Sequence, residues 1–328
     1  MHATHEATPT RLRPGVRLLD RLMKANAGFS VARMTPEQLE KAQTAVIPEG
    51  APVDLFLGRR APGIDISTTS FPARHGDLSL RVYTPEAWSR TPRPVVVNFH
   101  GGGFVLGSAR QQDWLCSLVA KNLDAVVVSV DYRLAPTHRF PAGVEDCYDA
   151  LVWTAAHAVD LGGDPTRIGV MGDSAGGNLA TVVSILARDA GLHVGHQALI
   201  YPVTDMTGAM DGDASYVRNV RGIVLSNADM EVFRGHYVPE DADLADIRLS
   251  PMYADLGDLP PAVVVVAGLD PLHDSGVRYA QALADAGNVV RVEDFHQMPH
   301  GFLSFPYFCA GARPAMEAIV ASQRAALR

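Results

Sequence analysis

The sequence lacks the features that would mark a secreted or membrane-spanning protein. It has 328 residues but only three cysteines, which are widely spaced and form no Cys-x-x-Cys pair: Cys116, Cys147 and Cys309. An odd set of distant cysteines is typical of a reducing compartment, so we expect three buried free thiols and no disulfide framework. No apolar run approaches the ~18 residues that a membrane-spanning helix needs. The sequence therefore predicts neither a disulfide scaffold nor an integral membrane protein.

Strong charge of either sign is also missing. The formal net charge is −8, and no cluster of lysine and arginine offers a patch for phosphates. We therefore expect no nucleic-acid partner. The first residues, "MHATHEATPTRLRPGVRLLD", have no continuous apolar stretch and are not interpreted as a signal peptide. Together these absences predict a cytoplasmic protein, and they leave the oligomeric state open, a homodimer included.

What the chain does have is a series of short apolar runs rich in β-branched residues. Several are apolar almost continuously, which is typical of strands buried on both faces of a mostly parallel sheet. The predicted strands cover residues 78–84, 94–100, 125–132, 167–172, 196–202, 261–268 and 289–295. Helical patterns lie between them, over residues 112–123, 144–159, 174–190, 271–286 and 313–327. This alternation predicts an α/β fold with helices on both faces of the sheet, in a single domain over residues 1–328.

Two segments interrupt the alternation, about 1–50 and 204–250. In the first, Val16, Leu19, Leu22 and Met23 fall on one helical face, and a second helix is expected in "TPEQLEKAQ" with Thr35 as its N-cap. In the second, Ser226 and Asp229 have the spacing of a capping box. We interpret both segments as a helical cap over one end of the sheet. A basic amphipathic N-terminus could alternatively rest on an anionic membrane, but Asp20 interrupts its basic face, and we expect no stable membrane association.

One serine stands in a distinctive setting, "IGVMGDSAGGNLA". The pattern Gly172-x-Ser174-x-Gly176 lies between a predicted strand and a predicted helix, which is the context of a nucleophile elbow with an exposed serine Oγ. The sharp turn brings the end of the strand so close to the start of the helix that a Cβ at either glycine would clash. Glycine-rich turns also occur for steric reasons alone, so this pattern is only one part of the argument.

A serine hydroxyl is a weak nucleophile. It needs a general base to take its proton and an acidic residue to orient that base. When the serine lies in a turn between a strand and a helix, both partners are expected later in the sequence, each in a loop that follows a strand. The acid is expected before the base. For the acid we prefer Asp270, just past the strand in "VVVVAGLDPLHD", to Asp274, which falls in the next helix. For the base we prefer His300, in the loop beside a glycine, to His296 at the end of the preceding strand.

The third requirement is a set of donors for the oxyanion that forms when a carbonyl is attacked. The N–H of Ala175, directly after the serine, is one expected donor. Others should come from the loop "HGGGF" (residues 100–104), which follows the predicted strand "VVVNF". Three consecutive glycines would let this backbone approach a substrate closely. A merely flexible loop is the alternative interpretation, and the position at the end of a strand argues against it.

Taken together, "HGGGF", "DYRLAPTHRFPAG", "GDSAGG", "DPLHD" and "HGF" resemble the hormone-sensitive-lipase family of esterases, the bacterial family IV type. The resemblance runs from about residue 76 to the end, and "SYVRNVRGIVLSNADMEVF" resembles the cap of that family. It implies an α/β-hydrolase fold and a carboxylic ester hydrolase that needs no cofactor and no metal. By motif position it implies Ser174, Asp270 and His300 as the triad. The implied oxyanion hole consists of Gly102, Gly103 and Ala175.

The resemblance also implies roles outside the triad and the oxyanion hole. Tyr132 and Arg133 would support the glycine loop, and His100 would orient it. One departure is His273 in "DPLHD", where the family more often has arginine; we expect it to affect local packing only. The expected substrate is a small ester with a short-to-medium acyl chain.

Several alternatives remain at this stage. His193 and His196 in "HVGH" could suggest a metal pair, but no cysteine or acidic ligand lies near them in sequence. Met298 and Phe302 could line the acyl pocket or pack in the core. A non-catalytic binding protein on the same fold would be expected to have an incomplete triad. A peptidase or amidase could use the same triad, although a peptidase usually needs a gating domain for which this chain has no room.

Overall fold

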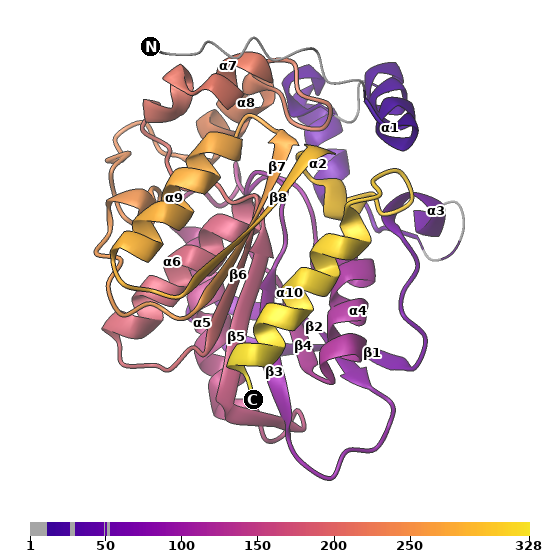
Figure 1. The fold of residues 1–328 in the computed structure, drawn as a ribbon, viewed down its shortest axis with the longest axis vertical. Coiled ribbons are helices and arrows are strands. Elements are labelled where there is room, and N and C mark those ends of the chain that lie inside the picture. The colour runs from indigo at the N-terminus through magenta and orange to yellow at the C-terminus, as the bar shows by residue number, and fades with distance from the viewer. Residues whose placement is uncertain (1–11, 27–29, 49, 51–52) are drawn as a thin grey trace, which may run out of the picture.

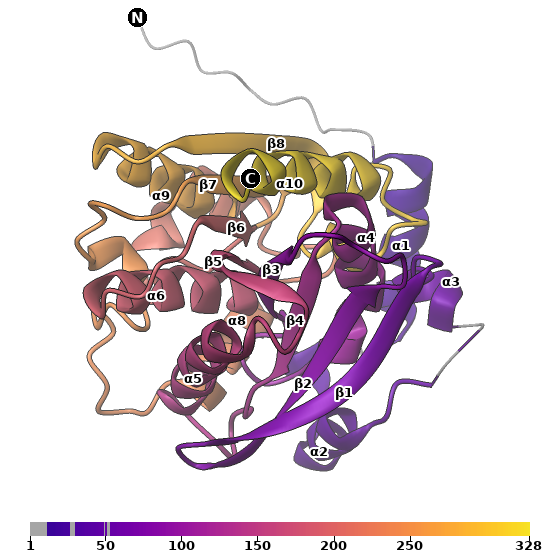
Figure 2. The same ribbon diagram turned by 90° about the horizontal axis from the view of Figure 1, so that it is seen from below.

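The computed structural model describes residues 12–26, 30–48, 50 and 53–328. Its centre is an eight-stranded sheet in the order β1-β2-β4-β3-β5-β6-β7-β8 (Figures 1 and 2). The strands are β1 (Ile64–Ala73), β2 (Gly76–Pro85), β3 (Arg93–Phe99), β4 (Val126–Asp131), β5 (Gly163–Asp173), β6 (His196–Ile200), β7 (Ala262–Leu269) and β8 (Val290–Pro299). All seven predicted strands are present, so the predicted α/β class with a mostly parallel sheet is confirmed.

The first strand, β1, was not predicted. It pairs antiparallel with β2, which in turn pairs antiparallel with β4, whereas the strands from β4 to β8 run parallel. β1 lies at the edge of the sheet, and most of its residues are exposed or half-buried. Its sequence, "IDISTTSFPA", has no continuous apolar run, because only isolated side chains pack on the helices: Ile64 and Ile66 on the side of α4, and Phe71 on the other side against Trp153 of α5. The sequence pattern that predicted the other strands, a continuous apolar run, is therefore absent from β1.

Helices cover both faces of the sheet. One face carries α4 (Asp113–Leu123) and α10 (Ala312–Ala326), which contact each other. The other carries α5 (Ala142–His157), α6 (Ala175–Asp189) and α9 (His273–Asp285). Figure 2 shows α5 and α6 on the opposite side of the sheet from α4 and α10. The valine-rich strands β3, β4 and β7 are buried between these layers, and their hydrophobic burial stabilises the platform on which the loops stand.

The two segments outside the alternation form short helices. These are α1 (Pro14–Ala25), α2 (Pro36–Thr44), α7 (Ala214–Arg218) and α8 (Asn227–Tyr237). Helix α3 (Val53–Leu57) was not predicted. Both predicted N-caps are confirmed, because Thr35 with Gln38 and Ser226 with Asp229 each form a complete capping box. On α1 the prediction was partly wrong: Val16, Leu19 and Met23 are buried, but Leu22 is 39% exposed.

The N-terminal segment and the insertion lie side by side although about 200 residues separate them in sequence (Figure 1). Asp229 at the start of α8 accepts hydrogen bonds from the Ser30 hydroxyl, at 2.6 Å, and from the Ala32 N–H, at 3.1 Å. Residues 1–11 of the expected cap lie outside the described residues.

The described part of the chain contains no helix that is long and apolar enough to cross a membrane. Cys116, Cys147 and Cys309 are buried free thiols, as predicted. Burial raises the pKa of the Cys309 thiol to about 12, so this sulfur stays protonated near neutral pH and is a poor nucleophile.

Candidate active site

Ser174 stands at a strained corner between β5 and α6. Its backbone has φ 55° and ψ −117°, in a region that residues with side chains rarely adopt. A Cβ on Gly172 would overlap the carbonyl of Gly176, and a Cβ on Gly176 would overlap the carbonyl of Phe99. Gly172 is therefore required by the close approach of β5 to the start of α6, as the sequence predicted, whereas Gly176 is required by the approach of α6 to the end of the neighbouring strand β3.

Ser174, His300 and Asp270 form a continuous chain of hydrogen bonds. The Ser174 hydroxyl lies 2.8 Å from Nε2 of His300, and Nδ1 of the same ring lies 2.7 Å from Oδ2 of Asp270. The other oxygen of Asp270 accepts the N–H of Leu272 at 2.9 Å. The predicted exposure of the serine was wrong: Ser174 is only 8% exposed, because helices of the insertion and the N-terminal segment surround it. Its Oγ therefore faces an enclosed space rather than the outer surface.

The two alternative residues lie outside this chain of hydrogen bonds. Asp274 is in the first turn of α9, where one oxygen accepts the N–H of Ser215 at 2.9 Å and the other lies 2.8 Å from Nδ1 of His273. The side chain of His296 is 79% exposed. Strand β8 continues to Pro299, so His296 lies within the strand rather than at its end. The preference for Asp270 and His300 thus agrees with the geometry.

The glycine loop after β3 has a defined backbone. Gly102 has φ +128° and Gly103 φ +63°, both in the region that favours glycine. A Cβ on Gly102 would overlap the carbonyl of Leu106, and one on Gly103 would overlap the ring of Phe233 in α8. The N–H of Leu106 donates to the carbonyl of Gly102 at 2.8 Å. This loop is therefore folded against its neighbours and is not merely flexible.

Ala175 is the first residue of α6 and is fully buried beside Ser174. The first four N–H groups of a helix have no intrahelical acceptor, and the helix dipole places positive potential there. The N–H of Ala175 belongs to this first turn. The glycine loop lies close to this turn, since Gly102, Gly103 and Ser174 line the same cavity.

Asp173 is an important residue that the sequence analysis did not single out. It is buried, and its Oδ1 accepts the N–H of Gly101 at 2.6 Å and the side-chain amide of Gln112 at 2.8 Å. Burial raises the pKa of the Asp173 carboxyl to about 6. The available signal was its charge, since a carboxylate at the end of an otherwise buried apolar strand needs partners. Asp173 joins the serine turn to the glycine loop.

Tyr132 supports the glycine loop as the resemblance implied, and Arg133 does so less directly. The Tyr132 hydroxyl donates to the carbonyl of His100 at 2.7 Å, and the two rings stack 4.3 Å apart. Burial lowers the pKa of His100, so its ring stays neutral. Arg133 instead pairs with the buried carboxylate of Asp146 in α5, at 2.8 Å. It therefore holds the segment that carries Tyr132, with no direct bond to the glycines.

Two apolar cavities meet at Ser174. The smaller encloses about 670 Å³, including the solvent at its mouth, and lies under α8 and the preceding part of the insertion. The larger encloses about 1680 Å³ and extends toward residues 45–57 of the N-terminal segment. Four residues line both cavities: Gly103, Ser174, Leu225 and Phe233. The Phe233 ring is thus part of the wall between them.

Met298 and Phe302 belong to the core rather than to either cavity. Met298 is 2% exposed and Phe302 is fully buried, and neither lines the two cavities. The Phe302 ring packs 5.7 Å from Tyr201 and 5.3 Å from Phe295, between ring centroids. Of the two interpretations left open by the sequence, core packing applies.

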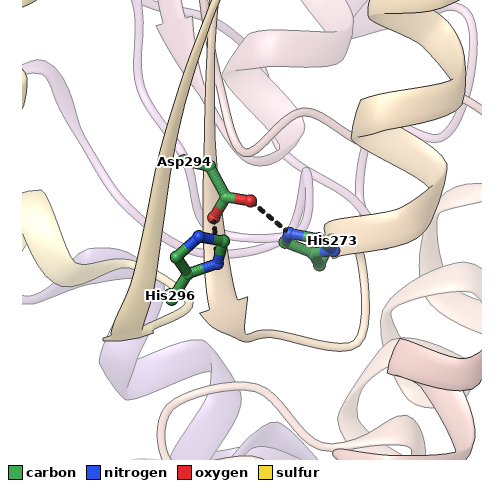
Figure 3. Close-up of side chains that lie close together, drawn as sticks. All are labelled: His273, Asp294 and His296. Atoms are coloured by element: carbon green, nitrogen blue, oxygen red, sulfur yellow. Dashed lines mark hydrogen bonds and ion pairs between the residues drawn. The ribbon is translucent and has the colours of Figure 1, made fainter. Parts of the chain in front are cut away.

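His193 and His196 do not form a metal pair. The ring of His196 is buried, its Nε2 lies 2.8 Å from the Ser322 hydroxyl, and burial lowers its pKa to about 4, whereas His193 is exposed. Among the described residues a different group has the spacing of metal ligands, His273, Asp294 and His296 (Figure 3). The sequence analysis missed it because His273 is distant in sequence from the other two.

Comparisons with known proteins identify the family to which the chain belongs. Residues 96–304 match a family described by the α/β hydrolase fold. Carboxylesterase NlhH from Mycobacterium tuberculosis is 38% identical over 305 residues, which cover 92% of this chain and 90% of that protein. Carboxylic ester hydrolase LipN from the same organism is 41% identical over 272 residues, or 80% of this chain and 71% of that protein.

A solved structure is equally similar over nearly the whole length. The esterase from Pyrobaculum calidifontis superposes with a TM-score of 0.84 at 37% identity, and the alignment covers 97% of this chain and 100% of that one. Sequence and structure therefore lead to the same group of enzymes. This chain belongs to the α/β hydrolase family and is a carboxylic ester hydrolase of the kind related to hormone-sensitive lipase.

Proposed function

We propose that the protein is a serine carboxylesterase that hydrolyses small esters with short-to-medium acyl chains through an acyl-enzyme intermediate. The observation that carries this proposal is the chain of hydrogen bonds from Ser174 through His300 to Asp270, at the meeting point of two apolar cavities. It combines a nucleophile, a base and an acid with room for an apolar substrate.

In the first half of the reaction, Ser174 Oγ attacks the ester carbonyl while Nε2 of His300 takes its proton. The distance of 2.8 Å suits this transfer. Asp270 accepts the Nδ1–H of the ring, which orients the imidazole and stabilises the imidazolium. The carbonyl oxygen becomes an oxyanion, and the N–H groups of Gly102, Gly103 and Ala175 are its proposed donors.

The tetrahedral intermediate then collapses. The bond between the carbonyl carbon and the alcohol oxygen breaks, His300 gives its proton to the departing alcohol, and the acyl group stays on Ser174. Water repeats the cycle, with His300 taking a proton from the water and returning it to Ser174 Oγ as the carboxylic acid leaves. Every proton that moves passes through Nε2 of one histidine, so this proposed mechanism needs neither a metal nor a cofactor.

The proposed substrate size follows from the enclosed site. We propose that the N-terminal segment and residues 204–250 act as a cap, since both contribute to the cavity walls around Ser174. With two cavities on the two sides of the nucleophile, one would hold the acyl chain and the other the alcohol. Each methylene that fits should contribute about 0.8 kcal/mol of burial until the wall is reached. Longer chains would have to displace the cap.

We also propose that the enzyme works in the cytoplasm. The three buried free thiols support a reducing compartment. Its partner there would be a small-molecule ester, without nucleic acid and without stable attachment to a membrane.

The function is tested with a fluorophosphonate probe and the Ser174→Ala variant. Wild-type protein should hydrolyse p-nitrophenyl butyrate, and the probe should label Ser174 and stop turnover. The variant should keep its thermal melting curve yet lose both labelling and turnover, because the nucleophile is gone. Labelling at a different residue, or burst kinetics in the variant, would refute the assignment.

A further inference from the structure

We propose that His273, Asp294 and His296 form a binding site for a divalent transition-metal ion such as Zn²⁺, separate from the active site. Asp294 and His296 are two residues apart on β8, so their side chains point to the same side of the strand. His273 is the first residue of α9 and faces them (Figure 3). The group therefore joins a helix to the neighbouring edge strand.

The ligand atoms have the spacing that such an ion requires. Nε2 of His273 lies 3.1 Å from Oδ2 of Asp294, and Nδ1 of His296 lies 3.2 Å from Oδ1 of the same carboxylate. All three ligand atoms lie within 4.8 Å of one another. Tetrahedral Zn²⁺ has bonds of about 2.0–2.1 Å, which place its ligands about 3.3 Å apart. Each histidine nitrogen already has nearly this separation from one oxygen of Asp294, although the two oxygens differ, and a small turn of the exposed His296 ring or of the carboxylate would bring both nitrogens to the same ion.

A second observation concerns Asp274, which lies behind His273. Its Oδ1 is 2.8 Å from Nδ1 of His273, and its other oxygen is held by the N–H of Ser215 at 2.9 Å. A neutral imidazole that donates Nδ1–H to a carboxylate presents the lone pair of Nε2 on its opposite side. Here that nitrogen points to Asp294. Histidine ligands of metals are typically oriented in this way by a carboxylate.

Charge also favours a cation. The carboxylates of Asp274 and Asp294 lie on the two sides of His273, and a divalent ion would balance their two negative charges. Two imidazoles and one carboxylate suit Zn²⁺, Ni²⁺ or Cu²⁺ better than Mg²⁺, which prefers oxygen ligands. The fourth position of the ion would be filled by water.

The position of the site predicts an effect on stability rather than on chemistry. His273 follows Asp270 by three residues, and its N–H donates to the carbonyl of Asp270 at 3.3 Å. Strand β8 leads directly to His300. A bound ion would therefore clamp together the two segments that carry the acid and the base of the proposed triad. It would resist their separation during thermal unfolding without touching the reacting atoms.

The experiment uses the full chain, stripped with EDTA and titrated with ZnCl₂ by calorimetry and thermal denaturation. We expect one Zn²⁺ per chain and a Tm that rises with the logarithm of the zinc concentration, because the ion binds the folded state. His273→Gln and His296→Gln should each weaken binding by about 10-fold or more, and Asp274→Asn by about 10- to 100-fold through the lost orientation of His273. The matched control, His193→Gln on the exposed surface, should bind zinc like wild type, and MgCl₂ should not raise the Tm.

Three results would overturn the proposal. One is the absence of zinc binding, which would leave the cluster as an ion-pair network. Another is a zinc affinity of the His273→Gln and His296→Gln variants that equals the affinity of wild type. The third is a combination of two observations: zinc does not change the Tm of wild type, and zinc inhibits ester hydrolysis equally in wild type and in His296→Gln. Such a result would place the ion at His300 instead.

Discussion

The carboxylate of Asp173 accepts the N–H of Gly101 at 2.6 Å, and this bond connects the residue before Ser174 to the glycine loop. The same oxygen accepts the amide of Gln112. The position of the glycine loop relative to Ser174 therefore depends on a contact between residues 72 positions apart in the sequence. Preorganised donors are effective only if their positions are fixed before the reaction.

Replacing Asp173 with alanine should loosen the glycine loop. The N–H of Gly101 would lose its acceptor, and the proposed donors at Gly102 and Gly103 would lose their fixed distance from Ser174. We expect kcat to fall by about 100-fold, near the lower end of the effect of removing an oxyanion donor, with a smaller change in KM. Asp173→Asn keeps an acceptor oxygen and should retain more activity. Equal kcat in wild type and Asp173→Ala would contradict this role; steady-state kinetics on p-nitrophenyl butyrate decide it.

A Gly103→Ala variant should be nearly inactive. Its backbone has φ +63°, and the new methyl group would overlap the ring of Phe233. We expect a loss of at least about 100-fold in kcat/KM. Adding Phe233→Ala removes the clash but not the backbone strain, so the double variant should recover only part of the loss. Recovery is measured as a double-mutant cycle in kcat/KM; a single Gly103→Ala variant with full activity would contradict the fixed-loop geometry.

Phe233→Ala should change the acyl-chain preference. The ring lies in the wall shared by the two cavities, and its removal enlarges the space beside Ser174. Wild type should prefer acyl chains of about four to eight carbons, as each added methylene contributes until the wall is met, and the variant should shift toward longer chains. The measurement is kcat/KM for p-nitrophenyl esters from acetate to palmitate, with and without an oil–water interface.

Val232→Ala is the matched control, because this neighbour on α8 lines neither cavity. Its chain-length profile should equal that of wild type. If wild type works best on palmitate or is strongly activated by the interface, the enclosed-pocket interpretation is wrong.

Asp229→Ala should weaken the contact between the N-terminal segment and α8. The residue accepts the Ser30 hydroxyl and the Ala32 N–H with one oxygen, and it completes the capping box of α8 with the other. Losing these bonds should cost about 2 kcal/mol in the free energy of unfolding and lower kcat/KM, because the proposed cap no longer closes. Urea denaturation and kinetics test both effects. Glu240→Ala removes an exposed carboxylate just after α8 and should change neither.

His196 should make the protein less stable in weak acid. Burial lowers its pKa in the folded state to about 4 from the ordinary value of 6.5. The unfolded chain therefore takes up the proton first as the pH falls, so the contribution of His196 is complete above pH 6.5 and is lost progressively down to about pH 4. The lost stability amounts to about 3 kcal/mol.

The measurement is urea denaturation at several pH values for wild type and His196→Gln. The variant has no titrating ring and should lose less stability over this range. His193→Gln, which changes an exposed histidine, should follow wild type. Parallel pH profiles for wild type and His196→Gln would show that the buried ring does not titrate as described.

The sequence by itself determined the α/β class and the sharp turn that carries the proposed nucleophile, Ser174. Continuous β-branched runs are typical of buried parallel strands, and the glycines at 172 and 176 predict a sharp turn from strand to helix around Ser174. Local chemistry also fixed the N-caps at Thr35 and Ser226, since a capping box involves residues three apart. Strand composition, turn glycines and capping boxes all depend on residues that are close in sequence, so they can be predicted without knowing the tertiary structure.

The tertiary structure decided what depends on segments that are distant in sequence. The choice of Asp270 and His300 over Asp274 and His296 required the actual distances to Ser174, although strand order had favoured it. The partners of Asp173 and the wall formed by Phe233 come from different elements, so no local pattern encodes them. The edge strand β1 was not predicted because it has no continuous apolar run, and its pairing with β2 is a contact between two strands. In each case the determining interaction is a contact across the fold, and such a contact exists only once the sheet and its helices have packed.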